Sequence, residues 1–449
     1  MVRNLCVIVS MLLLVSANPL AAQGQRDTKK DLSGKGDQTY TPDEMKKADS
    51  SSPSLEETSG PLTFRQAISL ALLKNPGLSA FAWEVRAKEA AALQAGLYPN
   101  PSVGVEVENV AGQGIYSGTN AAETTLFLSQ LFLLGGKIQK RRQVALLDHD
   151  LAGWDCESLR LNVLSQASKS FIKVLAAQER LVQAEQFLSI AERSYGAVTD
   201  RVESGKVSPI EETRASVALY SARVEQTTAS QELEASRKKL AATWGGAAPA
   251  FSKAVGSLEV MDQPLPFEKL ANLIDQNPDL ARWTTELEQR KAALELARAK
   301  RIPDLTLNAG VRNLQEMNDN AFVFGLTIPI PVFDRNQGGI QEAAHELNRA
   351  KDDKVSARIQ VLAVLAESYQ ALAASYSAAK TLEEKILPAA QKALDAIDYG
   401  YKQGKFGFLE LLDTQRTLFQ VRRQRIDTLS MYHLARIEVE RLVGYFSKE

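Results

Sequence analysis

The sequence contains too little cysteine for a disulfide-stabilised fold. Its 449 residues include two cysteines. Cys6 lies in the apolar N-terminal segment and Cys156 in the body of the chain. Once that segment is removed, one thiol remains and no internal disulfide can form. No cysteine stands at a cleavage position behind the segment, so we do not expect a lipid-anchored N-terminus.

Net charge and long apolar runs are also missing. The 53 lysine and arginine residues balance 54 aspartate and glutamate residues, which removes the electrostatic basis for binding nucleic acid. Beyond the N-terminus, no segment approaches the ~20 consecutive apolar residues of a membrane-spanning helix. We therefore expect a periplasmic or extracellular soluble protein, or an outer-membrane protein whose spanning elements are strands.

Motifs for catalysis and for metal binding are absent as well. The sequence contains no Gly-x-Ser-x-Gly, no His-Glu-x-x-His and no phosphate-binding loop. Its three histidines are His149, His345 and His433. His149 and Cys156 share a helix face, but two helical turns separate them, too far to hold one ion without bending the helix. We expect no enzyme activity, no cofactor and no metal site.

The N-terminal residues have the pattern of a secretory signal peptide. Arg3 supplies the positive charge, residues 5–15 form an apolar core, and small residues follow as far as Ala22. The alternative, a membrane anchor, would need a longer apolar run. We predict a signal peptide over 1–22. A disordered polar leader over 23–60 follows, because this segment cannot bury enough apolar surface to offset the cost of ordering.

The body of the chain contains an internal duplication. One constant offset aligns the following residues of the two halves without a gap: Asn75, Pro76, Leu78, Glu84, Ala90, Ala91, Ala95 and Pro101 with Asn277, Pro278, Leu280, Glu286, Ala292, Ala293, Ala297 and Pro303. Chance matching of helical alanine and glutamate does not explain both prolines and the shared order of elements. The sequence predicts a first repeat over 61–246 and a second over 264–449, joined by a linker over 247–263.

Each repeat is predicted to consist of a helix, a β-hairpin and a long helical hairpin. Apolar and polar residues alternate in the two β-hairpins, at 101–131 and 303–331. The helical hairpins occupy 137–244 and 338–446. The first helix of each is expected to span roughly 65 residues, or ~100 Å. Apolar residues spaced by three, four or seven in the first of these helices indicate coiled-coil packing along its length.

The four predicted strands cannot close a barrel by themselves. Open strand edges are not tolerated in lipid, and small barrels begin at about eight strands. A cyclic oligomer in which each copy contributes four strands would solve this, with the helices continuing the barrel as a tube.

The duplicated pattern resembles that of the TolC-family outer membrane factors, and it covers residues 62–446. The resemblance rests on the paired Asn-Pro-x-Leu helix starts and on three further strings: Tyr98-Pro99-Asn100-Pro101, Leu134-Gly135-Gly136-Lys137 and Ile328-Pro329-Ile330-Pro331-Val332-Phe333-Asp334-Arg335-Asn336-Gln337-Gly338. The last string is most similar to the branch that serves heavy-metal (cobalt–zinc–cadmium type) RND efflux pumps. The chain departs from many relatives in lacking a lipidated N-terminal cysteine and in its long polar leader.

This resemblance implies a mixed α/β membrane protein, built mostly of long α-helical coiled-coil hairpins plus two β-hairpins. Three copies would form a homotrimer with a twelve-stranded outer-membrane β-barrel, which an α-helical periplasmic barrel continues. The implied partners are a periplasmic adaptor (membrane fusion) protein, an inner-membrane RND pump and outer-membrane lipid, with no nucleic acid.

The resemblance also places the turns of the two helical hairpins at the periplasmic end of the tunnel, where the adaptor docks. The candidate docking residues are Gly205, Val207, Ser208, Ile210, Glu211, Gly404, Phe406, Gly407, Leu409 and Glu410. The candidate aperture gate consists of Asp200, Arg201, Glu203 and Lys402. Strand alternation makes Glu106 and Glu108 candidates for the barrel lumen, although solvated carboxylates near a loop would show the same pattern.

Several alternatives stay open from the sequence. The tips could be ordinary helix turns, and the four charged residues could be a solvated helix face. The leading prediction is a passive outer-membrane exit duct of a tripartite RND-type efflux system, and the similarity to the heavy-metal branch implies heavy-metal cations as its substrate. An exit duct for drugs or other small organic molecules is the alternative. A periplasmic coiled-coil adaptor is the other alternative, although its halves would be nested around one hairpin and would not stand in tandem.

Overall fold

The computed structural model describes residues 59–444. The predicted signal peptide, nearly all of the polar leader and the last residues of the second helical hairpin lie outside this range. Among the helices in 59–444, none is both long enough and apolar enough to cross a membrane.

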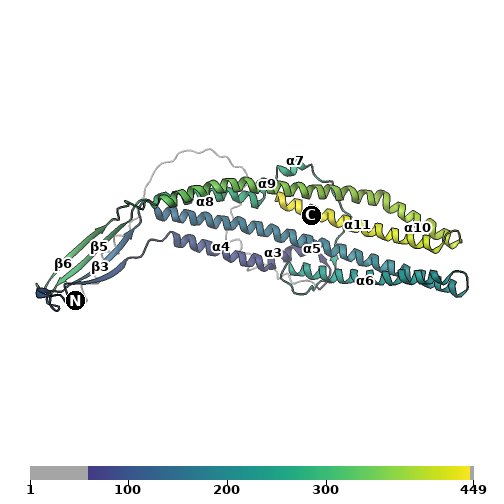
Figure 1. The fold of residues 1–449 in the computed structure, drawn as a ribbon, viewed down its shortest axis with the longest axis horizontal. Coiled ribbons are helices and arrows are strands. Elements are labelled where there is room, and N and C mark those ends of the chain that lie inside the picture. The colour runs from purple at the N-terminus through teal and green to yellow at the C-terminus, as the bar shows by residue number, and fades with distance from the viewer. Residues whose placement is uncertain (1–58, 445–449) are drawn as a thin grey trace. The chain divides into compact units, whose positions relative to one another are not determined.

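The first half of the described chain contains β1 (Leu62–Thr63), α3 (Phe64–Lys74), α4 (Pro76–Ala95), β2 (Ser102–Glu108), η1 (Gly114–Tyr116), β3 (Glu123–Phe132), α5 (Lys137–Glu203), α6 (Pro209–Ala242) and β4 (Ala254–Val255). The second half contains α7 (Phe267–Ala271), η2 (Ile274–Gln276), α8 (Pro278–Ala299), β5 (Leu305–Leu314), β6 (Asp319–Thr327), α9 (Gln337–Thr381), a π-helical turn η3 (Leu382–Ile386), α10 (Leu387–Lys402) and α11 (Phe408–Val443). The four strands β2, β3, β5 and β6 lie at one end of the long helices, and the two helix turns lie at the other (Figure 1).

Local signals set the start of the first helices. The Thr63 side chain accepts a hydrogen bond from Gln66 N, and the Gln66 side chain accepts one from Thr63 N, which together form a capping box. Asn75 ends α3 and caps α4, its side chain accepting from Leu78 N at 3.1 Å. Proline at the first position of α4 fits because its missing N–H would have no partner there.

The duplicated asparagines also tie together the two ends of each repeat. Asn75 Nδ2 donates to Thr243 O behind α6 at 2.8 Å. Asn277 Nδ2 donates to Arg441 O and Leu442 O in α11 at 3.1 and 2.9 Å. Carbonyl groups at a helix C-terminus have no partner within their own helix. One side chain therefore caps the start of one helix and the end of another.

The two β-hairpins join into one antiparallel sheet in the order β2-β3-β5-β6. One row across the sheet consists of Val105, Leu126, Val311 and Phe322. The next row consists of Glu106, Thr125, Arg312 and Ala321. Because directly opposed residues point to the same side, these rows alternate between an apolar and a polar face. The large side chains of the apolar face are exposed in the single chain.

The helices follow the same order as the strands. α4 packs on α5, α5 on α8 and α8 on α9. Along the chain, α4 leads into β2, β3 into α5, α8 into β5 and β6 into α9 (Figure 1). The outer members of both layers are therefore α4 with β2 on one edge and β6 with α9 on the other.

The segment expected to be a linker, 247–263, is part of the core. Its strand β4 pairs in parallel with β1, and Phe251 and Leu258 are fully buried among α3, α5, α6 and α11. A ring nitrogen of His433 lies 2.9 Å from Leu258 O. This two-residue pairing has no periodicity from which it could be predicted, because residues from distant parts of the chain form it.

The first helices of the two helical hairpins differ from each other in one turn. α5 is a continuous α-helix of 67 residues, whereas the corresponding helix of the second repeat contains the π-helical turn between α9 and α10. The second helix therefore has the expected extent, from Gln337 to Lys402, and contains a π-helical turn that the sequence did not predict. Pro388, at the start of α10, gives the reason: its missing N–H breaks the α-helical hydrogen-bond pattern.

Candidate functional site

The turns of the two helical hairpins share one backbone geometry. Gly205 and Gly404 have φ angles of +71° and +70°, the left-handed conformation predicted for a residue behind a helix C-terminus. In each turn, the N–H of the lysine after the glycine donates at 2.8 Å to a carbonyl in the last turn of the preceding helix. The two turns therefore present their following residues in the same way.

Aliphatic side chains behind the turns are exposed. Ile210 and Leu409 occupy the same position relative to the two glycines, and they keep 53% and 56% of their surface exposed. Phe406 is also exposed but lies against Gly400, where a Cβ atom would come within 2.3 Å of its ring. Val207 is half-buried.

The remaining tip residues shape the helix starts. The Ser208 hydroxyl accepts from Ile210 N at 3.4 Å and so caps α6. Gly407 precedes α11 and lies close to the Glu410 carboxylate. Glu211 and Glu410 stand in the first turns of α6 and α11, where the helix dipole favours negative charge.

Of the four candidate gate residues, Arg201 contacts the other hairpin. Its guanidinium carbon lies 5.0 Å from the centre of the Tyr401 ring, a cation–π contact between α5 and α10. Lys402 pairs with Asp398 of its own helix at 2.6 Å. Asp200 and Glu203 lie near the end of α5, and both are exposed. The structure thus brings one candidate into a contact between hairpins, together with Tyr401, which sequence reasoning did not identify.

A small apolar core joins the two tips below these charges. It contains Val198, Ala215, Ala218, Phe408 and Leu412, from α5, α6 and α11, with Tyr195, Val202 and Tyr401 against it. The Tyr401 hydroxyl oxygen is buried without a hydrogen-bond partner in the described chain. Since a buried hydroxyl normally has a partner, this unpaired oxygen reduces the stability of the contact between the tips.

Further contacts hold the two helical hairpins together above the tips. The rings of Phe187 and Phe419 stack with centroids 4.4 Å apart. Arg180 pairs with Asp427 at 2.7 Å, and Arg423 pairs with Glu225. These contacts link α5 and α6 to α11, so the two helical hairpins cannot separate along this stretch without breaking them.

The polar face of the sheet contains a charge network. Arg312 lies 2.9 Å from Glu108 and 2.8 Å from Glu123 and also donates to Thr125 at 2.9 Å. Glu106 shares this face and is exposed. The two glutamates predicted for the lumen therefore differ: Glu108 is paired with Arg312, and Glu106 is open to solvent.

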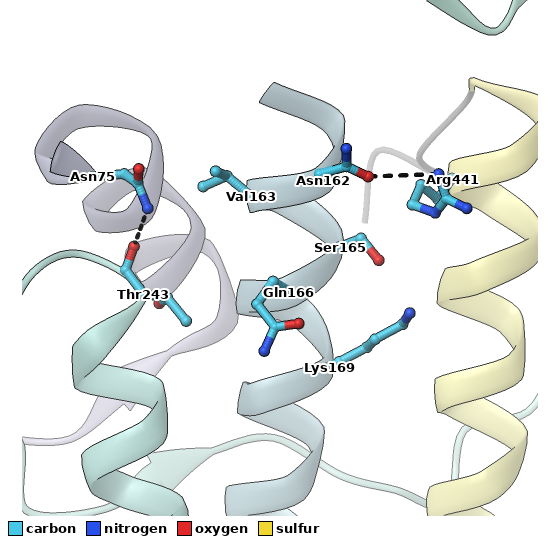
Figure 2. A pocket seen from close by; sticks show the side chains of 8 residues that line it. All are labelled: Asn75, Asn162, Val163, Ser165, Gln166, Lys169, Thr243 and Arg441. Atoms are coloured by element: carbon cyan, nitrogen blue, oxygen red, sulfur yellow. Dashed lines mark hydrogen bonds between the residues drawn. The ribbon is translucent and has the colours of Figure 1, made fainter. Parts of the chain in front are cut away.

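A groove of 360 Å³ lies between α5, α11 and the Asn75 cap, lined by Asn75, Asn162, Val163, Ser165, Gln166, Lys169, Thr243 and Arg441 (Figure 2). Its charged side chains are engaged with neighbouring groups: Arg441 donates to Asn162 at 3.5 Å, and Lys169 pairs with Glu438. Burial raises the pKa of Glu438, but hydrogen bonds from Arg441 and Lys169 outweigh it and lower the pKa overall. The groove fits a structural role between helices.

Two further ionisable side chains of the long helices have shifted pKa values. Burial lowers the pKa of His433, whose ring is held by Leu258 O. Burial also disfavours the charged form of Cys156: it raises the pKa of the thiol, so the thiolate is disfavoured. Within residues 59–444, no three His, Cys, Asp or Glu side chains come together as potential metal ligands.

The chain is similar to several known proteins over most of its length. It is 35% identical over 389 residues to the cobalt-zinc-cadmium resistance protein CzcC of Cupriavidus metallidurans, covering 86% of this chain and 91% of that protein. It is 27% identical over 300 residues to the nickel-cobalt-cadmium resistance protein NccC of Alcaligenes xylosoxydans xylosoxydans, covering 67% and 68%. Among solved structures, a membrane protein from Pseudomonas aeruginosa matches the fold with a TM-score of 0.75 at 20% identity, covering 85% and 90%.

A family model described as outer membrane efflux protein matches the chain in two segments, residues 67–246 and 270–445. Each segment contains one β-hairpin and one helical hairpin. The segments together include the four strands β2, β3, β5 and β6, the long helices and both tips. The chain therefore belongs to the outer membrane efflux protein family.

Proposed function

We propose that this chain is the outer-membrane exit duct of a tripartite RND-type efflux system. It conducts heavy-metal cations passively from a pump and an adaptor across the periplasm and the outer membrane. The supporting observation is its 35% identity, over most of both chains, to a cobalt-zinc-cadmium resistance protein of the same family. No reaction is required of such a duct, and none of the clusters described above resembles a catalytic site. An exit duct for drugs or other small organic molecules is the alternative.

The working form is a homotrimer in this proposal. The sheet of one chain has four strands and two unpaired edge strands, and its apolar face is exposed. Three copies would supply twelve strands, enough for a closed barrel with apolar side chains toward lipid and polar ones toward the lumen. The two family-matched segments would then be the two repeats, at 61–246 and 264–449, that supply one β-hairpin and one helical hairpin each.

The tips are the docking surface for the adaptor, and their glycine turns present Ile210 and Leu409 to it. Exposed aliphatic side chains in the same position of both turns suit an apolar contact with a partner. Around them the sequences differ, Lys-Val-Ser-Pro at 206–209 and Lys-Phe-Gly-Phe at 405–408. An adaptor would therefore meet two kinds of docking site.

The decisive experiment is complementation of a deletion strain, read out as resistance to cobalt, zinc and cadmium and, separately, to a panel of drugs. The wild-type chain should restore metal resistance. Leu409→Asp should abolish that rescue and leave the amount of protein in the outer membrane unchanged. Met431→Asp, at an exposed residue of α11 away from the tip, serves as the matched control and should rescue fully. Rescue of drug resistance alone would replace the metal proposal by its alternative.

A further inference from the structure

An exposed apolar segment joins β6 to α9, and we name residues 328–336 the apolar tongue. Ile328, Ile330, Val332 and Phe333 are all exposed, and Ile330 and Phe333 keep 82% and 90% of their surface. Contiguous apolar surface of this kind marks contact with another protein or with lipid. None of the tip or lumen roles described above involves this segment.

Hydrogen bonds within the tongue hold it in one conformation. Arg335 donates from Nε to Pro331 O at 3.2 Å and from Nη2 to Val332 O at 3.4 Å. Asn336 Nδ2 donates to Ala297 O near the end of α8 at 2.7 Å. Two prolines, at 329 and 331, restrict the backbone further. A segment ordered in advance loses little conformational freedom when it docks, so its apolar side chains can contribute their burial to a contact.

A hollow lies at the other edge of the chain, where α4 leads into β2. It measures 520 Å³ and is lined by Ala91, Gln94, Ala95, Leu97, Tyr98, Pro99 and Arg141; we name it the edge hollow. Its largest side chain, Tyr98, is 74% exposed. Arg141 donates to Ala95 O at 2.7 Å and to Leu97 O at 2.9 Å. The edge hollow is thus also fixed by an arginine that binds two main-chain carbonyls.

The topology places the tongue and the hollow at the same level on opposite edges. The connection from β6 to α9 and the connection from α4 to β2 both lie at the boundary between the strands and the long helices (Figure 1). In the order β2-β3-β5-β6, strand β2 leaves this boundary and β6 returns to it. A second copy that sets its β6 beside β2 of the first therefore continues the antiparallel alternation. The same step brings its tongue to the first copy's hollow.

We propose that the apolar tongue docks into the edge hollow of a second copy of this chain and forms a subunit contact at the strand–helix boundary. This contact rests on the oligomeric duct proposed above. The tongue's own turn favours a protein occupant over lipid. Val332 N donates to Ile330 O at 2.9 Å, so the chain turns here and Phe333 does not continue the strand alternation of β6.

Site-directed disulfide formation tests the contact in the full-length, membrane-extracted protein. Tyr98→Cys and Phe333→Cys are combined in a chain whose two native cysteines are replaced by serine. Mild oxidation should convert more than half of the protein to covalent dimers and trimers on a denaturing gel, and reductant should reverse this. Tyr116→Cys with Phe333→Cys is the matched control and should stay monomeric, because Tyr116 lies beyond the far end of β2, ~20 Å away.

The mass of each variant in detergent, and its channel conductance, separate the outcomes. A trimeric, conducting protein without cross-links overturns the tongue contact and leaves the duct intact. A protein that stays monomeric overturns the proposed assembly itself. Cross-links from Phe333→Cys alone would mean that two tongues meet, which overturns the proposal. So would quenching of a fluorophore at position 333 by spin-labelled lipid in vesicles, because the tongue would then lie in the bilayer.

Discussion

At the scale of single residues, Arg201 is the strongest candidate for holding the aperture closed. Its contact with the Tyr401 ring joins the two tips of one chain, and cation–π contacts contribute about 0.5–2 kcal/mol. We expect Arg201→Ala to raise the open fraction of the channel roughly twofold to thirtyfold, since each 1.4 kcal/mol is tenfold in an equilibrium. Single-channel recording in planar bilayers measures this fraction.

The control for that prediction is Lys402→Ala. Lys402 forms an exposed pair with Asp398 within its own helix, and pairs of this kind contribute little. The open fraction of the Lys402→Ala channel should match that of the wild type. Equal changes in the two variants would show that the Arg201 ring contact does not set the gate.

A second residue-scale prediction concerns His433 and pH. Burial lowers the pKa of this ring in the folded chain below the unfolded value of about 6.5. The unfolded state therefore binds more protons between the two pKa values. His433 destabilises the fold as pH falls below about 6.5 and has no such effect above it. We expect the unfolding temperature to drop between pH 7.5 and 5.5, and to drop less in His433→Asn.

Wild type and His433→Asn must be compared because other groups change the stability with pH in the direction opposite to His433. Burial raises the pKa of Glu179, despite the nearby Arg425, so its contribution to stability grows as pH falls toward that pKa. The difference between wild type and His433→Asn cancels this contribution. An identical pH dependence in the two proteins would contradict the assignment to His433.

Residue-level environments were only partly predictable from the sequence. The two glycine turns follow from local backbone chemistry, because glycine readily takes the left-handed conformation that both adopt. Exposure was less predictable, because it depends on what the fold brings near: Phe406 lies on Gly400, and Val207 is half-buried. Tyr401 was missed as the partner of Arg201, since the two are far apart in the sequence and no spacing rule connects them.

At the scale of elements, the duplicated asparagines offer a comparison inside one chain. Asn277 is 1% exposed and bonds two carbonyls of α11, whereas the less buried Asn75 bonds one carbonyl behind α6. A lost N-cap costs about 1 kcal/mol, and each buried group left unpaired about 1–3 kcal/mol more. We expect Asn277→Ala to lower the free energy of unfolding by about 3–7 kcal/mol, and Asn75→Ala by about 2–4 kcal/mol.

Denaturant unfolding of the detergent-solubilised protein, followed by far-ultraviolet circular dichroism, measures both variants. Replacement of each asparagine by aspartate is the informative control, because it keeps the cap and removes the donor. The Asn277→Asp variant should then lose most of the stability that Asn277→Ala loses. If the two alanine variants were equally stable, the additional carbonyl that Asn277 binds in α11 would contribute nothing to the free energy of unfolding.

Elements with local causes were predictable, and those with distant causes were not. The capping box at Thr63, the Asn-Pro helix starts and the alternation of the strands each depend on a few neighbouring residues. The pairing of β1 with β4 depends on a contact across much of the first repeat. The π-helical turn required knowing how the chain would accommodate Pro388, for which the sequence allows a kink, a break or a wider turn.

At the scale of the whole molecule, the order of the helices and strands is the feature that determines assembly. Helices α4-α5-α8-α9 follow the same order as strands β2-β3-β5-β6, so every strand continues a helix. Both layers end at the same two edges. An assembly that closes one layer therefore closes the other, which is why a sheet of so few strands can belong to a channel.

The charged residues on the polar face of the sheet lead to a prediction about the ion selectivity of the channel. Glu106 and Arg312 stand in one row on this face, and three copies would place three of each around the lumen. Glu106→Gln removes a solvated negative charge, so the cation-to-anion permeability ratio should fall about twofold at low salt. Arg312→Gln removes the positive partner of Glu108 and Glu123, so the ratio should rise by a similar factor.

Reversal potentials across a salt gradient measure both ratios in planar bilayers. Opposite shifts are the critical result, because a general disturbance of the barrel would move both variants the same way. Both shifts should also shrink at 1 M salt, where the screening length falls to about 3 Å. If instead neither variant changes the reversal potential while conductance is preserved, this face does not line the conducting path, and the orientation of the sheet in the duct must be reversed.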